Sequence, residues 1–240
     1  TQRPEQGTRQ GGFARAEVAV QVNYQPRRQR VCQIGAQRRR CSFIGKKACQ
    51  LGDAVVMMVV MDSHDYTRLA DEIKLWGKAL GFSALGIADT DLSVAEPRLL
   101  QWLAQGCHGD MDYMASHGVK RSRPAELVPG TLRVISARMD NRPPDARDSL
   151  AVLNDSDSAF ISRYALGRDY HKVLRARLQK LADKIAGKVG AFGYRVFTDS
   201  APVMETELAA KAGLGWRGKH SLVLTREAGS RVFIGEIYPD

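Results

Sequence analysis

Apolar residues recur at helical spacing in several stretches of this chain, and these stretches alternate with shorter apolar runs. The clearest helix begins near residues 63–65, where Ser and Asp can cap it, and ends before Gly81. A second strongly amphipathic helix opens after Asp169. Shorter helices are predicted at residues 96–105 and 205–212.

The remaining apolar runs have the length and the bounding turn residues of β-strands. They are predicted at residues 82–88, 132–139, 194–198, 221–225 and 231–237. Because helices and strands interleave along the chain, the pattern predicts an α/β fold built around a mixed sheet. Residues 140–157 are rich in acidic and small residues, and they are predicted to be a loop and the most mobile segment.

Charge divides the chain near residue 56. The net charge is +10, but residues 1–56 hold 11 Lys and Arg against 3 Asp and Glu, whereas residues 57–240 hold 25 against 23. The first segment lacks a regular apolar period, so little stable structure is predicted through about residue 53. It is either a basic arm that attracts RNA phosphates or an extension outside the working protein. Met57, Met58 and Met61 could be alternative starts, which favours the second interpretation and places the folded domain at residues 57–240.

Neither the apolar runs nor the cysteines indicate a membrane or secreted protein. The longest apolar run, residues 54–61, is well short of the roughly 20 residues that a membrane-spanning helix needs, and the N-terminus lacks the order of a secretory signal. The four cysteines are widely spaced, without a C-x-x-C metal pattern, and are predicted to be free thiols. We expect a cytoplasmic, monomeric protein that does not associate with membranes.

Two basic segments leave a ligand role open. Residues 120–123, Lys-Arg-Ser-Arg before a proline, could bind a phosphate or another anion, or could form an ordinary solvated turn. The polar face of the helix after Asp169 is also basic, which suits a polyanion but more often marks an exposed helix surface. His108 and His117 do not share a helical face, so no metal site is predicted there.

The residues from Gly213 to Gly218, GLGWRG, have the spacing G-x-G-x-x-G, but their context excludes a dinucleotide-binding motif. That motif follows a strand and opens a helix, whereas these glycines follow a predicted helix and open a predicted strand. A helix C-cap and turn would explain Gly213 alone. We favour the interpretation that the glycines let the backbone approach a large flat ligand, beside Trp216 and Lys219.

Asp199 is the strongest catalytic candidate in the residue pattern. It follows the predicted strand at residues 194–198, and Pro202 prevents that strand from continuing. A carboxyl group at a strand end could act as an acid if partial burial beneath a bulky ligand raised its pKa. A structural Asp that caps the following turn explains the pattern equally well.

Four segments, in the same order, closely resemble the N-terminal domain of epoxyqueuosine reductase over about residues 66–238. They are KRSRPAELVP at residues 120–129, SRYALGRDYHK at 162–172, TDSAP at 198–202 and AGLGWRGKH at 212–220. The resemblance implies a cobalamin-dependent, iron–sulfur enzyme that reduces the epoxide on the modified wobble base of tRNA, the last step of queuosine synthesis. It also implies an α/β domain similar to flavin-reductase-like cobalamin-binding domains.

Carried over residue by residue, the resemblance makes Asp199 the proton donor and a neighbour of the cobalamin. The other positions that it places at the cobalamin are Arg121, Ser162, Lys219, Val223 and Ile234. Position 162 is a cysteine in some family members. The implied chemistry is reduction by cobalt, with Asp199 protonating the departing oxygen, and the implied partner is tRNA that carries epoxyqueuosine.

The sequence departs from the family pattern in three places. Members continue into a ferredoxin-like domain with two [4Fe-4S] clusters, and this sequence lacks the corresponding cysteine runs. Residues 140–142, Asp-Asn-Arg, replace a more apolar segment, and residues 1–56 have no counterpart. We therefore expect a truncated product that does not turn over without an electron donor or an iron–sulfur domain in trans. The alternatives are a flavin- or nicotinamide-dependent reductase of similar fold and a noncatalytic RNA-binding module.

Overall fold

The computed structural model describes residues 48–51, 54–57, 63–142 and 145–240, in two compact units that divide after residue 58. In the first unit, β1 (Ala48–Leu51) pairs antiparallel with β2 (Ala54–Met57). This hairpin begins within the segment for which the sequence predicted little stable structure. It forms because two adjacent strand-length segments can pair locally. The predictions for residues 1–47 and for Met58 and Met61 fall outside the described residues.

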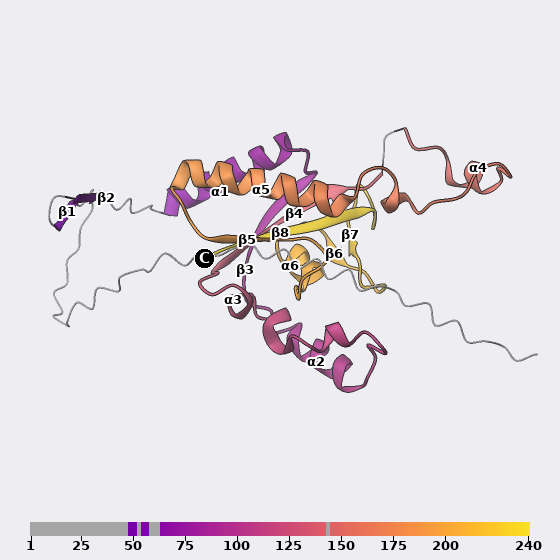
Figure 1. Cartoon of the computed structure of the whole chain (residues 1–240), viewed down its shortest axis with the longest axis horizontal. Helices are drawn as coiled ribbons and strands as arrows, with labels where there is room; N and C mark the ends of the chain where they lie inside the picture. Colours follow the sequence, from indigo (N-terminus) through magenta and orange to yellow (C-terminus); the bar gives the residue numbers. More distant parts are fainter. Residues whose placement is uncertain (1–47, 52–53, 58–62, 143–144) are drawn as a thin grey trace, which may run out of the picture. The chain divides into compact units, whose positions relative to one another are not determined.

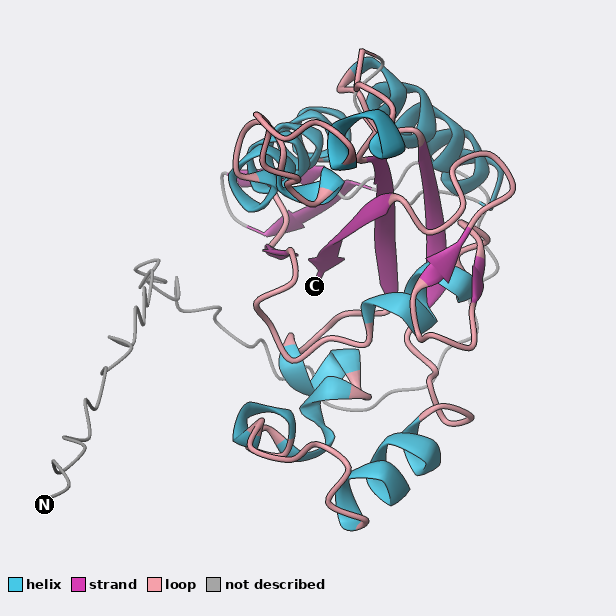
Figure 2. Ribbon diagram, turned by 90° about the vertical axis from the view of Figure 1, so that its right-hand side faces the viewer, coloured by secondary structure: helices cyan, strands magenta, loops and turns pink. Residues whose placement is uncertain are grey.

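The second unit is built around a four-stranded sheet, drawn in magenta in Figure 2. Its strands, in spatial order, are β3 (Ala84–Asp89), β4 (Arg133–Asp140), β8 (Val232–Pro239) and β5 (Tyr194–Phe197). Every neighbouring pair runs antiparallel, and Ile237 of β8 lies opposite Ile135 on one side and Val196 on the other.

The predicted α/β class with interleaved helices and strands is confirmed, but the prediction of a mixed sheet is wrong. The helical connection from β4 to β5 does make these two strands parallel to each other, as a crossover requires. However, β8 lies between them, so each contacts only antiparallel neighbours. The order of strands in the sheet differs from their order in the sequence, and the apolar pattern carries no information about that difference.

Two long helices cover one face of the sheet, as Figures 1 and 2 show. They are α1 (Ser63–Ala79) and α5 (Tyr170–Val189), and both were predicted. Asp169 caps α5 by accepting the backbone N–H of His171 at 3.0 Å. The buried core between these helices and the sheet consists of Ile73, Phe82, Leu85, Ile135, Ala137, Leu174, Leu178, Leu181, Ala182, Ile185 and Ile237.

A short helix, α6 (Glu205–Lys211), packs on the opposite face of the sheet. Its Leu208 joins Phe197 and Tyr238 in a second apolar core. Successive residues of β8 therefore serve different cores, with Ile237 on the α5 side and Tyr238 on the α6 side, as the two-residue period of a strand requires. The N-terminus of α6 consequently lies close to the end of β5, where Asp199 follows.

The remaining elements are short. They are α2 (Glu96–Ala104), α3 (Pro124–Leu127), α4 (Ser149–Leu153), β6 (Trp216–Arg217), β7 (Val223–Leu224) and 3-10 turns at Asp112–Met114, Gly118–Arg121 and Arg163–Ala165. Helix α4 interrupts the predicted loop at residues 140–157, because Asp148 caps it through the N–H groups of Leu150 and Ala151. Strand β6 was not predicted. Within the described ranges, no helix is long and apolar enough to cross a membrane.

Candidate functional site

Asp199 stands directly beyond the end of β5, at the position that the sequence predicted. Its backbone has φ = 61°, in the left-handed region that residues with a side chain rarely occupy. That conformation costs about 1 kcal/mol. Among the described residues other than glycine, only Ser221 shares it. The surroundings of Asp199 must therefore hold its backbone in place.

Two side chains from the first turn of α5 hold the Asp199 carboxylate. The Tyr170 hydroxyl donates to Asp199 Oδ2 at 2.6 Å, and His171 Nε2 lies 3.2 Å from the same oxygen. His171 Nδ1 lies 3.0 Å from Asp169 Oδ1, so the imidazole bridges two carboxylates. Because Asp169 is also the N-cap of α5, the start of the helix and the position of the site are determined together.

Burial by the polypeptide falls on the neighbour of Asp199, and the burial of Asp199 beneath a bulky ligand stays a prediction. The polypeptide leaves the Asp199 side chain 60% exposed. Glu205, which opens α6, is partly buried, and its Oε1 accepts the Asp199 backbone N–H at 2.7 Å. Burial and the negative charge of Asp199 raise the pKa of Glu205 to about 7, although the Asp199 N–H, His171 and Arg121 oppose that shift.

Glu236 adds a second carboxyl group below Glu205. It lies on the α6 face of β8 with 0% exposure, and its Oε1 is 3.4 Å from the Ser136 hydroxyl. Its Oε2 has no hydrogen-bond partner among the described residues. Burial and the charge of Glu205 raise the pKa of Glu236 well above its ordinary value, and burial likewise raises the pKa of Tyr238. The site therefore rests on a buried carboxyl group whose neutral form is favoured.

The basic segment at residues 120–123 divides into a structural half and a half available to a ligand. Arg123 donates to Glu96 at 2.8 and 3.0 Å and to Glu126 at 3.1 Å, so its positive charge is paired with two carboxylates of the protein itself. Arg121 is partly buried and donates to the Tyr113 carbonyl at 3.2 Å, but its Nε has no partner among the described residues. Arg121 is thus a candidate ligand contact, as the resemblance implied.

The ion pair of Arg123 yields a prediction about acid stability. The hydrogen bonds from Arg123 and then Ser122 lower the pKa of Glu96 to about 2 from 4.5. A lowered carboxyl pKa stabilises the folded state above pH 4.5, and this contribution is lost as the pH falls toward 2. We expect Arg123→Gln to unfold at a lower temperature than the wild type at pH 7, with the difference shrinking below pH 4.5. Thermal unfolding followed by circular dichroism measures this, and a pH-independent difference would contradict it.

Of the other residues that the resemblance placed at the cobalamin, two belong to an apolar cluster and two lie on exposed turns. Val223 is 4% exposed in a small apolar cluster with Ala209 and Leu214, and Ile234 packs against this cluster. Ser162 and Lys219 lie on exposed turns. The structure thus brings Arg121 and Asp199 together around Glu205, and Val223 and Ile234 together beneath α6.

The glycines between residues 213 and 218 have reasons within the chain itself, and their role in the close approach of a large flat ligand stays a prediction. Gly213 has φ = 77° and directly follows the C-cap of α6. A side chain at Gly215 would clash with the carbonyl of Leu224, and one at Gly218 would clash with the ring of His220. These close contacts allow β6 to pair with β7. The expected order of elements, in which the glycines follow a helix and open a strand, is confirmed.

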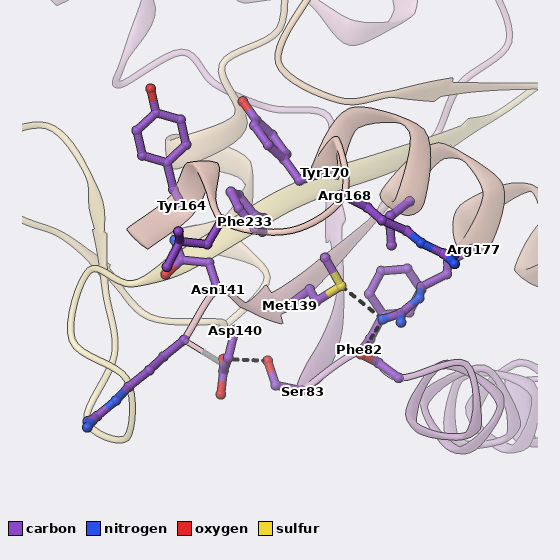
Figure 3. A pocket seen from close by; sticks show the side chains of 14 residues that line it. Phe82, Ser83, Met139, Asp140, Asn141, Tyr164, Arg168, Tyr170, Arg177 and Phe233 are labelled. Carbon is purple, nitrogen blue, oxygen red and sulfur yellow. Dashed lines mark hydrogen bonds between the residues drawn. The ribbon is translucent and has the colours of Figure 1, made fainter. Parts of the chain in front are cut away.

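A pocket of about 510 Å³, drawn in Figure 3, is lined in part by Tyr170, whose hydroxyl also contacts Asp199. The Tyr170 ring stacks on Phe233, with ring centroids 4.1 Å apart and planes within 4°. Tyr164, Arg168 and Arg177 also line the pocket. Arg177 donates to the Gly81 carbonyl at 2.9 Å, so part of the basic face of α5 is structural. Aromatic walls beside arginines suit an aromatic ligand that carries an anionic group.

Four residues of the cluster were missed in the sequence. His171 was counted only as part of the basic face of the helix after Asp169, and Tyr170 was given no role, although their position directly after the cap at Asp169 brings them to the site. Glu205 was taken only as the first residue of a helix. Glu236 was overlooked in a strand that is otherwise largely apolar; an acidic residue on the buried face of a predicted strand was the available signal.

Solved structures place the fold among reductase domains. A crystal structure of epoxyqueuosine reductase with an epoxyqueuosine-modified tRNA-Tyr stem loop superimposes with a TM-score of 0.58 at 24% identity, covering 72% of this chain and 45% of that one. The structure from Streptococcus thermophilus superimposes with a TM-score of 0.58 at 25% identity, over 70% of this chain and 45% of that one. The class of protein defined at this level is an α/β reductase-type domain.

Sequence comparison is more specific. The family model described as "Epoxyqueuosine reductase QueG, DUF1730" matches residues 121–200. The epoxyqueuosine reductase of Burkholderia pseudomallei is 58% identical over 195 residues, covering 75% of this chain and 48% of the relative. That of Escherichia coli is 54% identical over 176 residues, covering 73% and 46%. The chain belongs to the epoxyqueuosine reductase family, and it spans about half the length of the curated relatives that it matches.

Proposed function

We propose that this chain forms the cobalamin-binding part of an epoxyqueuosine reductase and supplies the proton for epoxide reduction in tRNA. The observation that carries the proposal is the strained Asp199, held at the sheet edge by Tyr170, His171 and Glu205, in a chain whose relatives bear this name. Removal of an epoxide oxygen as water takes two electrons and two protons. Asp199 Oδ is the group that gives a proton to the departing oxygen.

The neighbours of Asp199 orient its carboxyl group and provide a route by which it can regain a proton. Tyr170 and His171 both contact Oδ2, so the second oxygen, Oδ1, is left to face the substrate. His171 also touches Asp169, which is 46% exposed, so that a proton can return from solvent through the imidazole after each turnover. Their contacts hold the carboxyl group in one orientation, which is the main requirement for efficient proton transfer.

The residues present fit a cobalamin in chemistry. Arg121 is partly exposed and can present its guanidinium group to a polar group, and Trp216 and Leu222, in the same segment as Lys219, are about half exposed. The aromatic pocket next to Tyr170 suits a ring that carries a phosphate. When bound, cobalamin would supply a reduced cobalt centre as the electron source at the substrate. Ser162, Lys219, Val223 and Ile234 remain proposed contacts of the same cofactor.

The substrate and the electron supply complete the proposal. The relatives are named for epoxyqueuosine, so the proposed substrate is tRNA that carries this base, and the side chain of Lys172, 87% exposed, is available to a phosphate. The described residues contain no group of three or more potential metal ligands. Following the resemblance, the proposed electron source is an iron–sulfur domain with [4Fe-4S] clusters, or another electron donor, acting in trans. We place this reaction in the cytoplasm, with the catalytic domain at residues 57–240.

Reconstitution with cobalamin tests the proposal. The purified chain should change the visible spectrum of added cobalamin and retain the cofactor through gel filtration. Arg121→Gln should weaken retention at least about tenfold, because a charged hydrogen-bond donor to a ligand is worth roughly 1.5–3 kcal/mol. Lys120→Gln, which removes the same charge from the adjacent residue, is the matched control and should bind as the wild type does.

The same experiment separates the alternatives. A spectrum that stays that of free cobalamin, together with a flavin that co-purifies, would replace the proposal with a flavin-dependent reductase. A chain that binds neither cofactor but binds tRNA only when residues 1–56 are present would favour an RNA-binding module. Filter binding of tRNA to the full chain and to residues 57–240 makes this last comparison.

A further inference from the structure

We propose that Glu205 is a positioning residue for Asp199, and that its ionised carboxylate fixes the backbone of Asp199 in the geometry that proton transfer needs. This inference rests on the proposed role of Asp199 as proton donor. Glu205 Oε1 accepts the Asp199 backbone N–H at 2.7 Å, so this contact leaves the Asp199 carboxyl oxygens to Tyr170, His171 and the substrate. It therefore acts on the orientation of the donor rather than on the substrate.

The loop that carries Asp199 is fastened at both ends but strained between them. At one end, Thr198 is 1% exposed and its hydroxyl donates to the Phe197 carbonyl at 2.8 Å. At the other end, Leu208 and Ala209 are both fully buried and anchor α6. Between these ends, Asp199 is held at φ = 61°. The bond to Glu205 is the contact that ties the strained residue to the anchored helix.

The charged and titratable groups around Glu205 come from every element that packs against it. They are Arg121 from the 3-10 turn, Tyr170 and His171 from α5, Asp199 from the loop, and Glu236 and Tyr238 from β8. Arg121 and His171 favour an ionised Glu205, whereas burial and Asp199 oppose it. Glu236 below is itself driven toward the neutral form, so the two glutamates do not carry full charge together.

The strength of the hydrogen bond between Glu205 and the Asp199 backbone N–H depends on the ionisation of Glu205. Its pKa is raised from 4.5 to about 7, so the carboxylate predominates only above neutral pH. A carboxylate accepts an N–H bond more strongly than a neutral carboxyl group does. The Asp199 backbone is therefore most firmly held above pH 7 and is progressively released as the pH falls below it.

The test is the backbone amide of Asp199 in the full chain, labelled with ¹⁵N-aspartate and assigned by its loss in Asp199→Asn. In the wild type, the amide proton should move downfield as the pH rises, with a midpoint near 7. Glu205→Gln keeps an oxygen acceptor but cannot ionise, so that midpoint should disappear. Because His171 is present in both proteins, the difference assigns the midpoint to Glu205. Glu205→Ala removes the acceptor, so amide exchange should accelerate about tenfold.

Glu207→Gln is the matched control, since Glu207 lies on the same helix and pairs with Arg217 at 2.7 Å instead. It should reproduce the wild-type titration. An unchanged midpoint in Glu205→Gln, or unchanged exchange in Glu205→Ala, would overturn the inference; if Glu205→Ala does not fold, Glu205→Gln alone decides. Cobalamin retention, measured on the same samples, reports on the proposed function separately: its failure in the wild type leaves the amide result intact.

Discussion

Replacing Asp199 by Asn should slow epoxide reduction by about 10²–10⁴-fold, the range that positioned acids contribute. Asn has the same shape and tolerates a left-handed backbone, so the contacts to Tyr170 and Glu205 can persist. It cannot deliver a proton, which is why the reaction alone should be lost. The measurement is a single turnover of cobalamin-loaded protein with a chemical reductant and an epoxyqueuosine-containing tRNA, with queuosine detected by mass spectrometry.

Two comparisons make that result interpretable. Cobalamin retention should be unchanged in Asp199→Asn, because the substitution replaces the carboxyl group with an amide of nearly the same size and shape. Asp155→Asn, which removes a carboxylate that Arg147 contacts at 3.1 Å in an exposed loop, should turn over at the wild-type rate. Activity of Asp199→Asn within threefold of the wild type would exclude Asp199 as the donor.

Glu236→Gln should stabilise the folded protein at neutral pH and have little effect near pH 4.5. Glu236 is fully buried, and its pKa is raised above the 4.5 of the unfolded chain. The folded state therefore binds this proton more tightly than the unfolded state does, and the free energy of unfolding falls as the pH rises from 4.5 toward the raised pKa, by at most about 1.4 kcal/mol per pH unit. Gln is neutral at every pH, so the variant should become more stable than the wild type as the pH rises above 4.5.

Urea unfolding of the wild type and of Glu236→Gln at pH 5, 6, 7 and 8 measures this difference. The wild-type curve should decline with pH and the variant curve should be flatter. Glu126→Gln is the control: Glu126 pairs with Arg123 at the surface, and its loss should not alter the slope. Parallel curves for the wild type and Glu236→Gln would show that the buried carboxyl group is not protonated in the folded state.

The local pattern of the sequence was sufficient for the elements that carry the site. The apolar stripes and Asp169 determined α1 and α5, since periodicity and capping depend only on residues within one or two turns. The strand before Asp199 and the helix that precedes the glycines were predicted for the same reason. The long motifs around Ser162, Asp199 and Lys219 identified the family, because a resemblance needs no knowledge of contacts.

Only the tertiary structure decided what surrounds Asp199. β8 is separated from β5 by more than 30 residues in the chain but lies beside it in the sheet, and this insertion makes the sheet antiparallel and brings Glu236 beneath Glu205. Tyr170 and His171 reach Asp199 only because α5 packs with its first turn at the end of β5. Close packing also explains Gly215 and Gly218 without a ligand. The sequence by itself determined the two long helices, the four strands of the main sheet and the position of Asp199 after a strand, since these depend on neighbouring residues, whereas burial, charge and hydrogen bonding at Asp199 arise from residues that only the fold brings together.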